Sequence, residues 1–440
     1  FKGDLNVFRK KHDFRGDKSQ SKKNKFLLFF VKDERLYITM AAVMAAIILG
    51  WEWLCNKQVD SMIEFSTFSA VVIESILVFV VNRLRSHIMN QVEDPNKLTT
   101  DYDGLVKRYS LERNFVTCKN SDGTVVIPVI LEAKLYDKKI EIEDHPEKNY
   151  SLPEIIEKHY EDLFSAHVTS KIYNNTNIRV DEWGCVGDDN TFKFVTGRTT
   201  YYNSLVTNRA MDYSLIDGIS VRELLECGPM VHSLKNSSLL NHLGFNGFVE
   251  SSDGLIMLVY RKKNVSIAKR TYSDSVGASL KVKYALDETY TFTIDGLENG
   301  IIEEIKDELG IEKDTLEAVQ NTSGLKYVQL IAAYRDILEG GKPQLLFYAK
   351  TSMSQGEIEA AFYERNHQIK KAPGQYGSDA DKKEMETDGD KLVWISVSEL
   401  PDWDVYSDGI RCRKNGKEEY LKMVPSASAC VEMLKEYMNL

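Results

Sequence analysis

Three carboxylates in a short stretch of the sequence could carry metal chemistry. Glu304, Asp307 and Glu308 lie in the segment 299–311, whose apolar residues recur at the spacing of a helix. Side chains three or four positions apart are neighbours on a helix surface, so the three carboxylates would converge. Mg²⁺ is commonly held by carboxylates together with substrate phosphates. The pattern therefore suits a metal ion that bridges to a pyrophosphate, although a solvated acidic helix face has the same spacing.

A second candidate site is a cluster of basic residues in the segment 261–270. Its members are Arg261, Lys262, Lys263, Lys269 and Arg270. Basic side chains make strong, charge-assisted hydrogen bonds to phosphate oxygens, so these residues are candidate contacts to a nucleotide. A solvated basic loop is the alternative interpretation of the same cluster.

Regular elements are expected on both sides of these candidate residues. Two β-rich runs at 245–250 and 255–260 are separated by a turn that contains Asp253-Gly254, which predicts a hairpin just before the basic cluster. Gly310 follows the periodic apolar residues and predicts the end of the acidic helix. The basic cluster and the acidic helix thus belong to one α/β region.

The residues upstream of this region are less informative. Strands are predicted at 124–131 and 192–195, and helices at 152–163 and 220–226. This middle region contains no repeat and no recognisable catalytic motif. Some of its tyrosines and basic residues could line a nucleotide site, but such residues are more often ordinary surface or core; they are Tyr201, Tyr202, Tyr213, Lys193, Arg198 and Arg209.

The acidic helix resembles the second half of the Nudix family signature, R-E-U-x-E-E-x-G-U, where U is apolar. Residues 303–311 read E-E-I-K-D-E-L-G-I in those places. The resemblance covers roughly residues 243–440, because the hairpin, a glycine-containing segment at 275–278 and strands at 345–351 and 392–397 also match. It implies a Nudix-like α/β (α+β) domain with Mg²⁺ as cofactor and a nucleotide as ligand.

Three departures from the signature bear on activity. Glu303 replaces the arginine of the family, Asp307 replaces a glutamate, and the upstream half of the signature is interrupted by 281–296. Hydrolysis by a metal-activated water needs carboxylates held in register around the metal. The departures therefore favour a binding role over an enzymatic one. A polar insertion at 370–391 is predicted to be mobile, and it is either a lid over the ligand or plain disorder.

The overall charge argues against one class of partner. The chain has 440 residues, with 56 Lys or Arg and 66 Asp or Glu, and a net charge of −10. A general nucleic-acid binder neutralises phosphates with a basic surface, so we expect no DNA or RNA duplex as partner. The six cysteines lack the spacing of a zinc site and are typical of a reducing compartment.

This average hides a basic N-terminal segment followed by two apolar runs. Residues 1–35 carry a net charge of +6, which leaves −16 for the rest. The runs at 36–51 and 65–82 predict a two-helix transmembrane hairpin over 36–85. Basic residues flank the pair, so the positive-inside rule predicts a membrane protein with two spans and both termini in the cytoplasm. A buried helical hairpin in a soluble protein is the alternative.

Glu74 is the single charged residue of the second apolar run. An ionisable group at that depth normally faces a partner or a water-filled path. Glu74 would therefore contact a hairpin of another subunit, or be protonated, or lie nearer the headgroups.

The sequence thus predicts four parts, at 1–35 (basic, cytoplasmic), 36–85 (hairpin), 95–242 (α/β middle domain) and 243–440 (Nudix-like domain). This architecture resembles the transmembrane Nudix effectors of bacterial cyclic-oligonucleotide-based antiphage signalling systems. The resemblance implies that a nucleotide second messenger binds the cytoplasmic domain and drives a homo-oligomer. It also implies that the hairpins then disrupt the lipid bilayer of the inner membrane.

Two other functions remain open. A membrane-tethered, Mg²⁺-dependent Nudix hydrolase of a nucleoside diphosphate derivative such as ADP-ribose would use Glu304 and Glu308 as metal ligands. A ligand-gated channel or membrane tether would use the Nudix-like domain only as an assembly surface. Release of a nucleotide that depends on Mg²⁺ would identify the hydrolase, and absence of any nucleotide binding would favour the tether.

Overall fold

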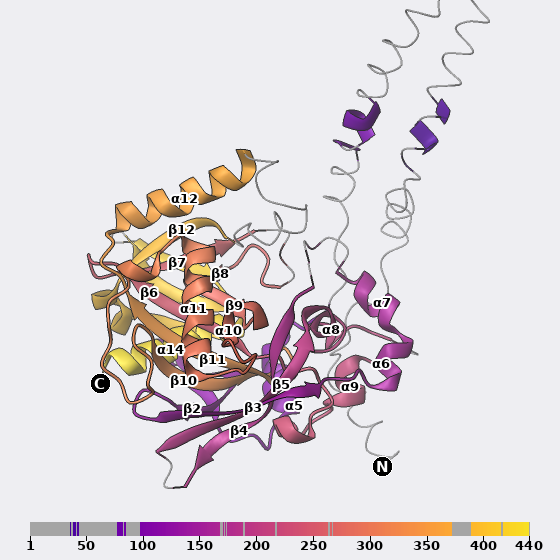
Figure 1. Ribbon diagram of the computed structural model, residues 1–440, viewed down its shortest axis with the longest axis horizontal. Helices are drawn as coiled ribbons and strands as arrows, with labels where there is room; N and C mark the ends of the chain where they lie inside the picture. Colours follow the sequence, from indigo (N-terminus) through magenta and orange to yellow (C-terminus); the bar gives the residue numbers. More distant parts are fainter. Residues whose placement is uncertain are drawn as a thin grey trace, which may run out of the picture. The chain divides into compact units, whose positions relative to one another are not determined.

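The computed structural model describes most of the chain beyond residue 96. The described residues are 36, 38–40, 42–43, 77–81, 83–84 and 97–439, the last range without 168–169, 171, 173, 188–189, 216–217, 263–264, 266, 372–388 and 415–416. The chain divides into two compact units, Phe1–Gly16 with Asn96–Leu440, and Asp17–Pro95. Described residues of the second unit are helical, and the following paragraphs concern the first unit (Figure 1).

The length and composition of the described helices bear on the predicted membrane spans. The two longest are α11 (Ile294–Leu309) and α12 (Gln355–Lys371), with 16 and 17 residues and many charged side chains, whereas a span needs ~20 apolar residues. No helix in the described ranges is both long and apolar enough to span a bilayer. This finding overturns the predicted inner-membrane location with two spans. Most of the predicted hairpin, Glu74 included, lies outside the described residues.

Nine strands form the main sheet (Figure 1). Seven lie in the order β1-β2-β10-β11-β6-β7-β12, while β8 pairs with β7 and β9 with β6. All these pairs are antiparallel except β11 with β6. The strands are β1 (Phe115–Asn120), β2 (Gly123–Lys134), β6 (Gly244–Glu250), β7 (Leu255–Arg261), β8 (Tyr272–Ser273), β9 (Val276–Ser279), β10 (Gln329–Asp336), β11 (Lys342–Lys350) and β12 (Gly389–Ser396).

Two three-stranded sheets accompany the main sheet. One has the order β13-β14-β15 and the other β3-β5-β4. Their strands are β3 (Lys139–Asn149), β4 (Thr176–Val186), β5 (Thr191–Thr200), β13 (Asp404–Tyr406), β14 (Gly409–Lys414) and β15 (Lys417–Lys422). The expected mixed α/β architecture is confirmed, and the predicted strand at 192–195 is part of β5.

The other helices are short, apart from one at the C-terminal end. The α-helices are α5 (Tyr102–Arg108), α6 (Glu154–Lys158), α7 (Tyr160–Ser165), α8 (Tyr201–Leu205), α9 (Val221–Leu225), α10 (Val282–Ala285) and α14 (Pro425–Met438). The 3-10 helices are η1 (Asn208–Ala210), η3 (Leu234–Asn236), η4 (Lys313–Thr315) and η5 (Val397–Asp402).

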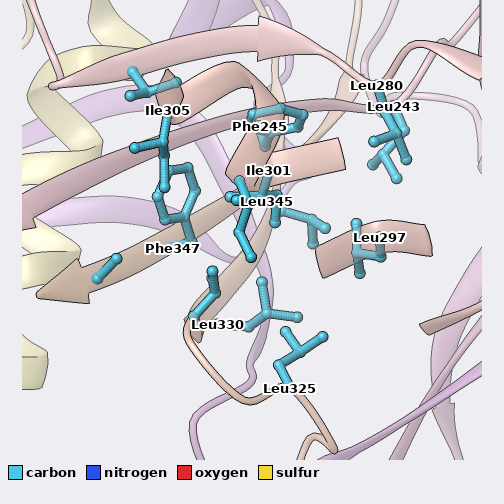
Figure 2. Packing of buried hydrophobic residues seen from close by; sticks show 14 of the residues in the cluster. Leu243, Phe245, Leu280, Leu297, Ile301, Ile305, Leu325, Leu330, Leu345 and Phe347 are labelled. Atoms are coloured by element: carbon cyan, nitrogen blue, oxygen red, sulfur yellow. The ribbon is translucent and has the colours of Figure 1, made fainter. Parts of the chain in front are cut away.

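Helices cover both faces of the main sheet, because each face of its central strands is apolar. Helix α11 packs on one face, where its isoleucines meet Phe245, Leu345 and Phe347 in a single cluster. Helix α14 packs on the other face with the β13-β14-β15 sheet. Figure 2 shows the first cluster; its labelled members are Leu243, Phe245, Leu280, Leu297, Ile301, Ile305, Leu325, Leu330, Leu345 and Phe347.

The predicted middle domain shares this core with the predicted Nudix-like domain. Strand β2 pairs with β10, so residues from the middle region extend the main sheet. Ile178 and Val180 of β4, together with Phe192 of β5, belong to the same cluster as α11. The residues from Asn96 onward accordingly form one compact unit.

A fully buried arginine links the middle region to the main sheet. Arg222 of α9 makes two hydrogen bonds to Asp212, with Nε–Oδ1 at 2.7 Å and Nη2–Oδ2 at 3.0 Å, and neither side chain is exposed to solvent. The same guanidinium donates to the carbonyl oxygens of Ile337 and Leu338, just after β10, and to the Tyr109 hydroxyl. Its donors are thus matched by acceptors from three parts of the chain.

The R222M substitution is expected to lower the free energy of unfolding by about 3–5 kcal/mol, because it leaves Asp212 buried without its cation. Urea unfolding of the full chain, followed by circular dichroism, measures this loss. The matched control is K235M, which breaks a pair with Glu182 whose side chains are 70% and 50% exposed and should cost less than about 1 kcal/mol. Equal stability of R222M and K235M would contradict the assigned role.

Candidate functional site

Helix α11 carries the predicted metal ligands. It begins after Thr293, whose hydroxyl accepts a hydrogen bond from the Gly296 N–H at 3.2 Å. It ends at Gly310, where a φ of 76° gives the left-handed conformation that favours glycine. The predicted helix stop at Gly310 is therefore confirmed, although the helix begins five residues earlier than the segment expected from residue 299.

Two glycines bring a neighbouring segment unusually close to one face of α11. A Cβ atom at Gly296 would lie 1.9 Å from the carbonyl oxygen of Ala285, and one at Gly300 would lie 2.3 Å from Leu280. Residues 296, 300 and 304 are four apart and share one face. Helix α10 and the residue before it therefore pack directly beside Glu304.

Lys281 occupies the space beside Glu304. Its Nζ lies 2.7 Å from Oε1 of Glu304, and the two side chains are only 11% and 3% exposed. Burial raises the pKa of Glu304, and the nearby ammonium opposes that rise. Burial alone would lower the pKa of Lys281, but the attraction of Glu304 outweighs it and the pKa is raised. The Nζ–Oε1 distance is that of a direct ion pair.

Asp307 is also held by groups of the protein. Its Oδ1 accepts from Nη2 of Arg365 on α12 at 2.9 Å, and its Oδ2 accepts from the Tyr284 hydroxyl at 2.9 Å. Glu303 and Glu308 lie on the same helix and are half-buried. In the described part of the chain, no group of three or more His, Cys, Asp or Glu side chains is placed to hold a metal ion. As arranged, the predicted ligands do not suit Mg²⁺.

A second ion pair fixes the chain just before α11. Arg198 of β5 makes two hydrogen bonds of 2.6 Å to Asp144 of β3, and the side chains are 7% and 1% exposed. The same carboxylate accepts from the Phe292 N–H at 2.8 Å. Despite its burial, Asp144 keeps a lowered pKa because of Arg198 and Phe292. Arg198, a possible nucleotide contact from the sequence, is therefore part of the support of α11.

The basic residues form a loop, here called the basic loop, that joins β7 to β8 over residues 261–270. Its neck is closed by the Arg261 N–H donating to the Thr271 carbonyl at 2.9 Å and by the Arg270 N–H donating to the Arg261 carbonyl at 3.2 Å. Lys262 and Lys269 are half-buried and Arg270 is exposed. The structure brings these cations to one loop, while Lys263 lies outside the described residues.

Arg261 differs from the other cations of the basic loop because a buried carboxyl lies near it. Asp274 is 2% exposed. Burial raises its pKa well above the usual range, and the positive charge of Arg261 opposes this. The remaining described cations of the loop are Lys262, Lys269 and Arg270.

Beside the basic loop lies a feature that the sequence did not reveal, here called the tyrosine row, of Lys391, Tyr260 and Tyr272. The three residues pair across β12, β7 and β8. The two rings are 5.0 Å apart and edge-to-face, and the Lys391 Nζ lies 5.0 Å from the Tyr260 ring centre. The only signal in the sequence is a tyrosine on each side of the basic loop, with Tyr260 before it and Tyr272 after it.

The other basic and aromatic residues suggested by the sequence do not join this surface. Lys193 pairs with Glu141 and Glu143 on the β3-β5 surface. Arg209 lies over the Tyr201 ring at 5.4 Å and pairs with Glu339 at 3.4 Å. Lys193 and Arg209 thus contact other residues of the fold. Tyr202 contacts Phe164 and Tyr213 donates to Asp162, also within the middle region.

A buried histidine lies among the cations behind the basic loop. One ring nitrogen of His167 contacts the Leu205 carbonyl at 2.9 Å, and the other contacts the Lys97 Nζ at 3.2 Å. Burial lowers the pKa of His167 well below its usual value, and the charges of Lys97, Arg209 and Lys269 add to the effect. The imidazole is therefore neutral in the folded state.

Comparisons with known proteins give a limited result. No known sequence family matches the chain, and no curated protein matches it. The crystal structure of DR0079 from Deinococcus radiodurans is 12% identical, covers 36% of this chain and 70% of its own, and has a TM-score of 0.21. The MutT protein from Methanosarcina mazei Go1 is 8% identical, covers 45% and 94%, and has a TM-score of 0.22. At these TM-scores the similarity is weak and carries no argument about fold family or activity.

The buried histidines predict a loss of stability in acid. Burial likewise lowers the pKa of His242, so below about pH 6.5 the unfolded chain binds protons that the folded chain does not. Each histidine then costs up to ~1.4 kcal/mol per pH unit. The H167Q and H242Q variants should each lose part of this slope between pH 6.5 and pH 5, measured by urea unfolding. The partly exposed His145 provides the control H145Q, and an unchanged slope in both buried variants would contradict the prediction.

Proposed function

We propose that the chain is a nucleotide-binding sensor in which the basic loop holds phosphates and the tyrosine row receives a base. The observation that carries the proposal is the tyrosine row next to Lys262, Lys269 and Arg270. Aromatic faces stack on bases without needing a particular sequence, and nearby cations hold the phosphates. Both kinds of contact meet at the β7-β8 hairpin.

The tyrosine row has the chemistry that such a ligand requires. Tyr260 and Tyr272 are both half-buried. Lys391 already lies over the rings of both tyrosines, at 5.0 Å and 5.9 Å, and a cation in that position is attracted to the ring faces. A ligand with a flat base and a polyphosphate or cyclic phosphodiester fits this surface better than an acidic peptide does.

The sensor role includes assembly as its second step. A ligand drives a homo-oligomer only if it binds the assembled form more tightly than the free protomer. A cyclic oligonucleotide is a suitable ligand because its several phosphates and bases can be shared between protomers. Supporting this part is the resemblance of the sequence to nucleotide-responsive effectors.

Calorimetry with a panel of cyclic di- and trinucleotides and ADP-ribose tests the binding step. Tyr260→Ala should weaken the best ligand by about 5- to 150-fold, the worth of one stacked base at ~1–3 kcal/mol. Tyr260→Phe, which keeps the ring, should bind like the parent. A matched control is Tyr327→Ala, because Tyr327 also lies under a lysine, Lys326 at 4.9 Å, but belongs to another surface.

Charge variants test the phosphate contacts in the same assay. Arg270→Ala and Lys269→Ala should weaken binding and reduce its dependence on salt, because each removes one cation from the phosphate site. Absence of binding to every nucleotide in the panel would contradict the proposal. Breakdown of the nucleotide that requires Mg²⁺ would instead identify a hydrolase.

The assembly step predicts a change of particle size. Adding the best-binding nucleotide to the full chain should increase the mass measured by mass photometry, and Arg270→Ala should need more ligand for the same increase. An unchanged mass at saturating ligand would contradict the assembly step, while the binding step would still stand.

A further inference from the structure

We infer that the ammonium group of Lys281 takes the place of a divalent cation on helix α11, so that this part of the protein is built to work without metal. The inference concerns only α11 and its neighbours and does not depend on which ligand the basic loop binds. It follows from the packing of α11, the burial of Glu304 and the balance of charge around it.

The first argument is that the packing of α11 delivers Lys281 to Glu304. Gly296 and Gly300 allow the chain from Leu280 to Ala285 to lie directly on the helix. Helix α10 begins after Lys281, which is therefore fixed at the start of this segment. A side chain at Gly296 would meet the Ala285 backbone and push the two helices apart, whereas at Gly300 it would displace the Leu280 side chain.

The second argument is that Glu304 is unsuited to a free or solvated role. Its side chain is 3% exposed, and an isolated carboxylate at such depth would be strongly destabilising. A positive charge is needed beside it. The Lys281 Nζ supplies that charge at 2.7 Å, where a metal ion bound to the same carboxylate oxygen would compete with it for the site.

The third argument is the charge balance of the surrounding groups. Asp307 is paired with Arg365, and Tyr284 donates to its second oxygen. The two carboxylates Glu304 and Asp307 thus each face a fixed cation of the protein, Lys281 and Arg365, and their charges are balanced without a divalent ion. The lysine also differs from a metal in being covalently attached, so its effective concentration does not depend on the medium.

The experiment compares the full-length parent with K281M, and with K306M as a matched control. Lys306 lies on the same helix and pairs with Glu312 at 2.8 Å, but its side chain is 40% exposed. Thermal unfolding is recorded with MnCl₂, with MgCl₂, with EDTA, and with NaCl at matched ionic strength. Binding of Mn²⁺ itself is measured by electron paramagnetic resonance.

The parent and K306M should unfold at the same temperature with and without divalent ions, and should show no stoichiometric Mn²⁺ binding. K281M should unfold at a lower temperature, and added Mn²⁺ should raise that temperature, because the metal now neutralises Glu304. The double variant K281M/E304Q removes both charges, so it should lose the response to Mn²⁺ and recover stability relative to K281M.

Stoichiometric Mn²⁺ binding by the parent, weakened in E304Q, would overturn the inference. So would a K281M protein that unfolds like the parent and ignores Mn²⁺, because Lys281 would then have no charge to neutralise. If K281M does not fold, folding of K281M/E304Q supports the inference and its failure to fold opposes it. None of these readouts uses a nucleotide, so their outcome is separate from that of the proposed function.

Discussion

The buried pair of Arg222 and Asp212 is the contact on which the arrangement of the whole compact unit depends. A guanidinium without exposure must have every donor matched, and here the acceptors come from the loop before α9, from the turn after β10 and from Tyr109. Tyr109 in turn donates to the Glu226 carbonyl at 2.6 Å. One charged side chain thus fixes the middle region to the main sheet, and no apolar residue of similar volume could specify the same set of partners.

The same physical solution recurs where the sequence first suggested chemistry. Arg198 with Asp144 supports the start of α11, and Lys281 with Glu304 lies along its glycine face. In each case a buried carboxylate is neutralised by a cation from a distant part of the chain. Arg198 and Glu304, which the sequence suggested as site residues, therefore form buried ion pairs that support the fold.

The sequence predicted the elements well and the partners of charged residues poorly. Strands β2, β6 and β7 and the stop of α11 at Gly310 follow from apolar patterns and turn residues within short segments. Strands β11 and β12 were expected from the family resemblance. The predicted helix at 152–163 is instead two helices that meet at His159. The pairing of Lys281 with Glu304 could not be predicted, because it requires residues 280–285 to pack against α11 at Gly296 and Gly300. Such packing is tertiary structure and leaves no local pattern in the sequence.

The tyrosine row, the proposed ligand contact, likewise could not be predicted in full from the sequence. Tyr260 and Tyr272 could have been placed opposite each other once β7 and β8 were known to pair, but Lys391 joins them from β12, after a long insertion. Only the register of three strands puts the lysine over the rings. If α11 is internally neutralised, ligand phosphates find no metal there and must be met directly by cations. Basic residues of the loop lie in sequence beside the tyrosine row at the β7-β8 hairpin, so recognition is proposed for this hairpin and a supporting role for the acidic helix.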